Sequence, residues 1–232
     1  QILTPPSAAE GKGGMEVLLV AAKKDKITDY TEVIKQAGRV PVVMDVDAFA
    51  LQNAYEANYD VDANSVVALL NAGASGINVN IISGDQSLFT RDISMCGNAY
   101  TEAIQKELGL TFEDAERLKK GEGIDGARPE DVQPILRAVT DNLLLETQKT
   151  FDFFKATAAS ERIDLILISG GTSRIDGFAQ MVADRFGTPV ESFDPFRRIQ
   201  FEGSKFGIDD VADVAPVSAV AVGLALRRAG DR

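Results

Sequence analysis

The amino-terminal part of the chain alternates between short apolar runs and amphipathic segments. Apolar runs over residues 17–21 and 40–44 each predict a strand. Between them, apolar side chains recur at the three- and four-residue spacing of a helix: Ile27, Tyr30, Val33 and Ile34. Gly38 follows as a typical helix stop, and residues 47–58 predict a second helix. This part therefore reads as strand, helix, strand and helix.

The middle of the chain predicts three strands joined by short turns, followed by a helix. The strands cover residues 66–70, 77–82 and 87–93, with turn-forming residues between them. The helix is expected from about residue 99 to 108, with Asn98 as its N-cap and Gly109 as its stop.

The last part of the chain predicts further alternation of helices and strands. Thr111 opens a helix, since Asp114 stands at the capping-box spacing from it. A turn-rich segment, 121–131, leads to a long helix whose apolar residues fall mostly on one face: Val132, Ile135, Leu136, Val139, Leu143, Phe151 and Phe154. The remaining elements are a buried strand within 163–171, a helix over 175–186, a short strand over 190–193 and a small-residue helix over 217–226. The whole pattern predicts an α/β fold with helices on the faces of a sheet.

Composition removes several classes of function. A net charge of −11 argues against a protein that coats nucleic acid or an anionic membrane, and no run of about 18 apolar residues predicts a membrane span. The single cysteine, Cys96, excludes an internal disulfide. Because there is no histidine, a Ser-His-Asp triad and a His-ligated zinc site are excluded. Chemistry would have to come from carboxylates, amides, hydroxyls, the backbone or a bound ion.

Six small residues, 71–76, separate the first two of the three central strands. A dinucleotide-binding G-x-G-x-x-G loop opens a helix, whereas this loop opens a strand, so that motif is excluded. Two explanations remain for the loop. It is either a tight turn that binds nothing, or a turn whose backbone N–H groups hold phosphate oxygens.

A second glycine turn follows the buried strand near the carboxyl terminus. Gly170 and Gly171 end the strand, and Thr172 and Ser173 are expected to start a helix, with Ser173 and Asp176 at capping spacing. Paired glycines at the carboxyl end of a strand let a flat ligand lie against the backbone. They also serve strand-to-helix turns that need left-handed residues and bind nothing.

Taken in chain order, these features resemble the actin-like (ribonuclease H-like) ATP-binding fold. More narrowly, the sequence resembles the PilM family of type IV pilus assembly, which is similar to the division protein FtsA. Three stretches carry the resemblance: MDVDAFALQNAYE, CGNAYTEAIQKELGLTFEDAERLKKG and ILISGGTSRIDGF. The resemblance extends over nearly the whole chain, from about Met15 to Leu226.

The resemblance implies a division into domains. Its parts are the end of a small FtsA- or PilM-type subdomain (1–44), the return helix of the first actin-like domain (45–65), the second actin-like domain (66–213) and a connecting helix (214–232). A helical insertion beside the nucleotide is expected at about 111–158. The family's first phosphate hairpin, with its own metal-directing Asp, is expected to precede Gln1.

The resemblance also implies a site for ATP and Mg²⁺. The residues that it assigns to the nucleotide are Asn71, Gly73, Ala74, Ser75 and Gly76 (second phosphate loop), Gly97 and Asn98 (start of a helix), Glu116 and Lys119 (ribose and adenine) and Gly170, Gly171 and Thr172 (adenosine support). Without the family, Glu116 and Lys119 would read as a solvated ion pair one helical turn apart, and Asn98 as a helix cap.

Two positions depart from the pattern of the family. Asn71 stands where the second phosphate loop begins with an Asp that holds Mg²⁺ through water, and an amide brings no charge to a hard cation. Asp47 stands where a longer Glu or Gln orients the attacking water, and it is the candidate catalytic residue. Both changes weaken metal and water positioning, which phosphoryl transfer requires. They favour holding ATP over splitting it.

Three functions compete on these grounds. The first is a cytoplasmic ATP-binding scaffold, peripheral to the inner membrane. It would bind the cytoplasmic tail of PilN and through it the PilN/PilO complex. The pilus motor ATPases are further candidate partners, and the chain is a candidate homo-oligomer. The second is an active ATPase or small-molecule kinase of the same superfold. A filament protein like FtsA ranks last, because residues 224–232 are too short for an amphipathic membrane-binding tail. Nucleic acid is not an expected partner.

Overall fold

The structure is a computed structural model that describes residues 2–4, 16–157, 162–200 and 211–230. The chain divides into two compact units, one formed by residues 1–45 with 227–232 and the other by residues 46–226. We describe each unit by itself.

The smaller unit contains a two-stranded ladder and one helix. Strands β1 (Ile2–Thr4) and β2 (Glu16–Val17) pair antiparallel, and helix α1 spans Lys24–Gln36. The helix stop is confirmed, since the chain reverses through Gly38 with φ +74°. The predicted strand over 17–21 is reduced to its first residue, and the strand predicted over 40–44 is wrong. A strand needs a neighbour for its backbone groups, and among the described residues none pairs with 40–44.

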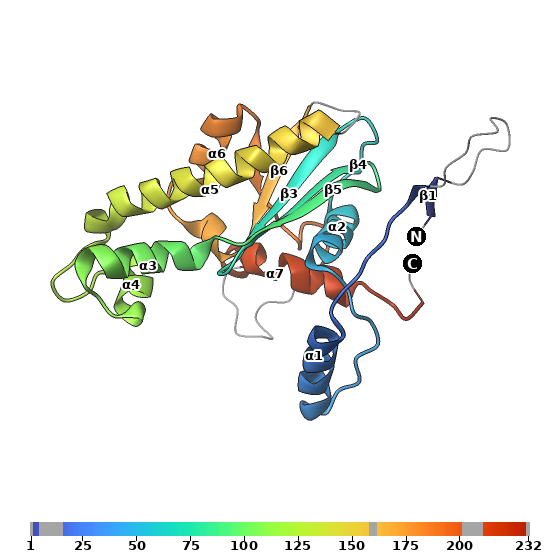
Figure 1. The fold of residues 1–232 in the computed structure, drawn as a ribbon, viewed down its shortest axis with the longest axis horizontal. Helices are drawn as coiled ribbons and strands as arrows, with labels where there is room; N and C mark the ends of the chain where they lie inside the picture. The colour runs from blue at the N-terminus through green and yellow to red at the C-terminus, as the bar shows by residue number, and fades with distance from the viewer. Residues whose placement is uncertain (1, 5–15, 158–161, 201–210, 231–232) are drawn as a thin grey trace. The chain divides into compact units, whose positions relative to one another are not determined.

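The larger unit is built on a five-stranded sheet with the order β5-β4-β3-β6-β7 (Figure 1). Its strands are β3 (Val66–Ala72), β4 (Ile77–Ser83), β5 (Gln86–Ile93), β6 (Leu165–Ser169) and β7 (Val190–Ser192). Strands β3, β4 and β5 form an antiparallel meander, whereas β6 pairs parallel with both β3 and β7. In the register of β3 and β6, Asn71 lies opposite Ser169. The two glycine turns that follow these strands therefore leave the sheet at the same edge.

Helices cover both faces of this sheet, as the alternation predicted. They are α2 (Asp47–Asn58), α3 (Gly97–Leu108), α4 (Phe112–Lys119), α5 (Pro129–Thr157), α6 (Phe178–Phe186) and α7 (Val211–Ala225), with a short 3₁₀ turn, η1 (Gly171–Arg174). Helices α3, α5 and α6 bury their apolar faces against one side of the sheet, and α2 and α7 pack against the other (Figure 1). The side chains of Leu143, Phe151 and Phe154, predicted on one face of the long helix, are all buried in the larger cluster.

Two expected helix starts differ in the structure. Asn98 was predicted to cap α3, but the N-cap is Cys96 and no side chain supplies the cap. Ser173 does not cap a helix either, because its hydroxyl donates to the carbonyl of Gly170 at 2.7 Å and α6 begins only at Phe178. Thr111 is confirmed as the start of α4, since it is the N-cap and its hydroxyl accepts the N–H of Asp114.

Candidate functional site

The small-residue loop after β3 is a tight hairpin with free backbone donors. The N–H of Gly73 donates to the carbonyl of Gly76 at 2.9 Å and closes the turn. Ala74 and Ser75 at its tip are exposed, and within the described part of the chain neither backbone N–H donates a hydrogen bond. Two adjacent free N–H groups at a turn form an anion-binding concavity of the kind that holds phosphate.

The first turn of α3 holds this hairpin in place. The N–H groups of Gly97 and Asn98 donate to the carbonyls of Gly73 (3.1 Å) and Ala74 (2.7 Å). A Cβ at position 97 would lie 2.9 Å from the Thr172 hydroxyl oxygen and 3.0 Å from the Gly73 carbonyl oxygen. Glycine is therefore required here by the close approach of helix and hairpin.

The turn after β6 meets the same hairpin from the other side. The buried hydroxyl of Thr172 donates to the carbonyl of Gly73 at 2.9 Å and accepts from the thiol of Cys96 at 3.4 Å. Gly170 has φ +86°, and a Cβ there would lie 2.2 Å from the Ala72 carbonyl oxygen. By contrast, a Cβ at Gly171 would meet no atom within 4 Å. Gly170 thus allows the two turns to pack, and Gly171 leaves open space beside them.

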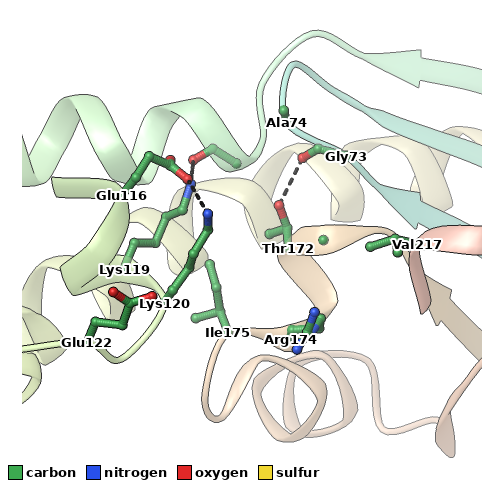
Figure 2. Close-up of a pocket in the computed structure, with 12 residues that line it drawn as sticks. Gly73, Ala74, Glu116, Lys119, Lys120, Glu122, Thr172, Arg174, Ile175 and Val217 are labelled. Carbon is green, nitrogen blue, oxygen red and sulfur yellow. Dashed lines mark hydrogen bonds and ion pairs between the residues drawn. The ribbon is translucent and has the colours of Figure 1, made fainter. Parts of the chain in front are cut away.

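These elements enclose a cavity of about 510 Å³ (Figure 2). Its lining residues are Gly73, Ala74, Gly97, Glu116, Lys119, Lys120, Glu122, Gly171, Thr172, Arg174, Ile175 and Val217. Seven of the residues assigned from the sequence are therefore brought together: Gly73, Ala74, Gly97, Glu116, Lys119, Gly171 and Thr172. Ser75, Gly76, Asn98 and Gly170 are their chain neighbours but do not line the cavity.

The wall formed by α4 carries a compact ionic cluster. The Lys119 ammonium forms a short ion pair with Glu116, and Lys120 lies 3.7 Å from the other carboxylate oxygen of Glu116 (Figure 2). Lys119 also donates to the Gly97 carbonyl (3.2 Å) and to the Thr101 hydroxyl (2.9 Å). Burial alone would raise the pKa of Glu116, but hydrogen bonds from Lys119 and Thr101 and the two lysine charges together lower it. The carboxylate is therefore ionised at neutral pH.

Asn71 does not line the cavity. It belongs to a row of polar side chains that crosses four strands. Its amide N–H donates to Asn78 at 3.0 Å, its oxygen accepts from the Ser169 hydroxyl at 3.3 Å, and Asn78 in turn donates to Asp92 at 2.9 Å. One N–H and the oxygen of the Asn71 amide thus each have one protein partner. In the described residues, no group of three or more acidic, Cys or His side chains is placed to hold a metal ion.

Asp47 is exposed at the first position of α2 and does not line the cavity. The next residue, Ala48, is fixed by its carbonyl, which accepts from the buried side chain of Asn80 at 2.9 Å. The start of α2 is therefore held against β4 at Asn80, which lies two residues after Asn78 on that strand. The catalytic role of Asp47 stays a prediction.

The structure adds residues that sequence reasoning missed. Lys120, Glu122, Arg174, Ile175 and Val217 also line the cavity. Arg174 directly follows the Gly-Gly-Thr-Ser stretch. Its place next to a candidate ligand-binding turn could therefore have predicted that it lines the site. Val217 was not foreseeable, because it lies on α7 and reaches the cavity only through the packing of that helix.

A comparison with protein families decides the family of this chain. Residues 2–229 match the family of the type IV pilus assembly protein PilM. The chain belongs to the PilM family. The resemblance seen in the sequence is therefore confirmed.

Solved structures agree with this assignment. The chain is similar to a "PilM-PilN type IV pilus biogenesis complex" structure, with 27% identity and a TM-score of 0.80 over 90% of this chain and 60% of that chain. Two more distant structures share the fold. The ethanolamine utilization protein EutJ from Carboxydothermus hydrogenoformans matches with 18% identity and a TM-score of 0.62, over 88% of this chain and 62% of that chain. MreB 5 of Spiroplasma citri bound to AMPPNP matches with 15% identity and a TM-score of 0.61, over 88% of this chain and 64% of that chain.

The predicted actin-like fold is thereby confirmed. The chain spans about 60% of the length of the matched PilM chain. Within the described residues, no helix is both long and apolar enough to cross a bilayer.

Proposed function

We propose that this PilM-family chain is part of a cytoplasmic, ATP-binding scaffold of the type IV pilus assembly platform. In this function ATP occupies the cavity between the hairpin and α4, and the cytoplasmic tail of PilN is the protein partner. The observation that carries the proposal is the combination of two free N–H groups at the hairpin tip with open space at Gly171. Phosphate oxygens fit the first feature, and a flat ligand against the backbone fits the second.

A substitution at Gly171 tests nucleotide binding without disturbing the fold. A Cβ at this position meets no protein atom within 4 Å, so Gly171→Val places the first carbon of its side chain in the open space of the cavity. We expect its affinity for ATP, measured by isothermal titration calorimetry, to fall at least tenfold while the urea midpoint stays unchanged. Gly123→Val, in an exposed loop with equally open space, is the matched control and should bind as the unchanged chain does. Equal ATP affinities of the two variants would mean that the nucleotide binds outside this cavity.

We propose further that ATP is held rather than split. Asn71 brings no charge, and its amide is engaged by Asn78 and Ser169, so Mg²⁺ would be held by the ATP phosphates and by water that contacts Asn71. This assignment gives the protein little control over the metal and the attacking water. We expect release of inorganic phosphate to stay at background in a stopped assay with Mg²⁺ and saturating ATP. Turnover that disappears on Asp47→Ala would instead favour the ATPase or kinase.

The proposed partner is supported by the likeness to PilM in a PilM-PilN complex. It also accounts for a location at the inner membrane, which the chain would reach through PilN. We expect a fluorescent peptide of the PilN cytoplasmic tail to bind this chain saturably in an anisotropy titration, and a scrambled peptide of the same composition not to bind. No binding of the tail peptide would mean that the partner surface needs residues outside the 60% of that chain that this one matches. The proposal for this chain would then fail.

A further inference from the structure

Thr101 lies one turn inside α3 and is fully buried beside the ionic cluster of the cavity. Its hydroxyl donates to Oε1 of Glu116 through a short hydrogen bond and accepts from Nζ of Lys119 at 2.9 Å. The Gly97 carbonyl is a poorer alternative acceptor at 3.5 Å. One hydroxyl thus connects the carboxylate and the ammonium of α4 to the helix that holds the hairpin.

The Lys119 ammonium is saturated by protein groups. An ammonium has three N–H donors, and three acceptors surround this one: the Gly97 carbonyl, the Thr101 hydroxyl and the Glu116 carboxylate. Only 12% of its side chain is exposed. Lys119 therefore has no donor left for a ligand, and its contribution is to orient Glu116.

Glu116 is consequently the hydrogen-bond acceptor of the cluster that can meet a ligand, and the exposed Lys120 is its open cation. Its Oε1 is committed to Thr101 and Lys119, whereas Oε2 lies 3.7 Å from the exposed Lys120 ammonium. A carboxylate repels phosphate, so we place the phosphates at the free N–H groups of the hairpin and a neutral hydrogen-bond donor beside Glu116. The hydroxyl groups of a sugar are donors of this kind, and their hydrogen bonds to a carboxylate are charge-assisted.

We infer that Thr101 is a positioning residue that directs Oε2 of Glu116 toward the sugar hydroxyls of a bound nucleotide, and so sets a preference for ribonucleotides over deoxynucleotides. This inference rests on the proposed nucleotide binding. Thr101 does not touch the ligand. It acts by fixing the rotamer of Glu116, because loss of the hydroxyl would leave Oε1 with Lys119 alone and free the carboxylate to turn toward Lys120.

The test compares three proteins and three ligands. Calorimetric affinities for ATP, 2′-deoxy-ATP and 3′-deoxy-ATP are measured on the unchanged chain, on Thr101→Val, which keeps the shape and removes the hydroxyl, and on Thr101→Ser, which keeps the hydroxyl. A hydrogen bond to a charged group corresponds to a preference of about tenfold or more. We expect the unchanged chain and Thr101→Ser to prefer ATP over at least one deoxy analogue by this factor, and Thr101→Val to lose most of the preference.

The ratio of two affinities on one sample does not depend on the fraction of folded protein, so it separates positioning from stability. If the unchanged chain binds ATP and Thr101→Val keeps the same ratio, the inference is wrong and nucleotide binding stands. Lack of preference in the unchanged chain also overturns it. If the unchanged chain binds none of the three ligands, the proposed function itself fails.

Discussion

Replacing Gly223 by Ala would test how closely α2 and α7 pack. These two helices lie side by side on one face of the sheet (Figure 1), and a Cβ at position 223 would stand 1.7 Å from the carbonyl oxygen of Ala50. The same Cβ would lie 2.4 Å from the carbonyl carbon of Ala50. Both obstructing atoms belong to the backbone of α2, so no side-chain rotation can relieve the overlap.

Two effects of opposite sign decide the size of the change. Ala is favoured over Gly inside a helix by about 1 kcal/mol. Overpacking typically costs about 1–3 kcal/mol and occasionally more. The upper end applies here because the helices must separate by more than an ångström, which loosens the packing of the buried side chains of Leu51 and Ala219. We expect a net loss of about 2 kcal/mol.

Urea unfolding followed by far-ultraviolet circular dichroism would measure this loss. Gly123→Ala is the matched control, since its Cβ meets nothing within 4 Å, and its free energy of unfolding should change by less than about 0.5 kcal/mol. Gly223→Ala at or above the stability of the unchanged chain would refute the reasoning, because helix propensity would then outweigh the contact and the helices could not be as close as described.

Three further predictions concern the cavity. Gly97→Ala should weaken ATP binding about tenfold in calorimetry, because the added Cβ pushes the hairpin away from α3; unchanged affinity would contradict this. Burial raises the pKa of the Cys96 thiol, so the thiol stays protonated near neutral pH and iodoacetamide should modify it only in concentrated urea; rapid labelling of the native chain would count against the buried site. Despite burial, the Lys119 and Thr101 hydrogen bonds hold the folded pKa of Glu116 below its ordinary value, so its stabilisation is present at neutral pH and is lost as the pH falls through the folded pKa. Urea midpoints of Glu116→Gln should therefore fall less between neutral and acidic pH than those of the unchanged chain, and parallel curves would exclude the ionic cluster as a stabilising element.

Local patterns determined most of the larger unit. Helix α2 was predicted with its observed bounds, and β3, β4 and β5 to within two residues at each end. The continuous apolar run of β3 marks a strand that is buried on both faces, and turn-forming residues mark the ends of β4 and β5. The glycine stop of α3 and the N-cap of α4 were also readable, since each depends on groups only a few residues apart.

Predictions failed where a distant segment replaced a local partner. Asn98 is not a cap because the carbonyls of Gly73 and Ala74, more than twenty residues earlier, accept the first N–H groups of α3. Residues 40–44 form no strand in the described structure, because pairing needs a neighbouring strand that a sequence pattern cannot supply.

The candidate site divides in the same way. The sequence by itself determined where the two glycine turns fall, since their small residues interrupt strongly apolar runs. It also indicated the family, because its motifs follow one another in the order that the family shows. Only the tertiary structure decided which side chains meet. Parallel pairing of β3 with β6 brings the hairpin and Thr172 together across about a hundred residues, and the packing of α3 on α4 places Thr101 between Glu116 and Lys119. Such contacts arise from long-range packing and have no local signature. A Thr that looks like an ordinary helical residue in the sequence therefore becomes the group that joins Glu116 and Lys119.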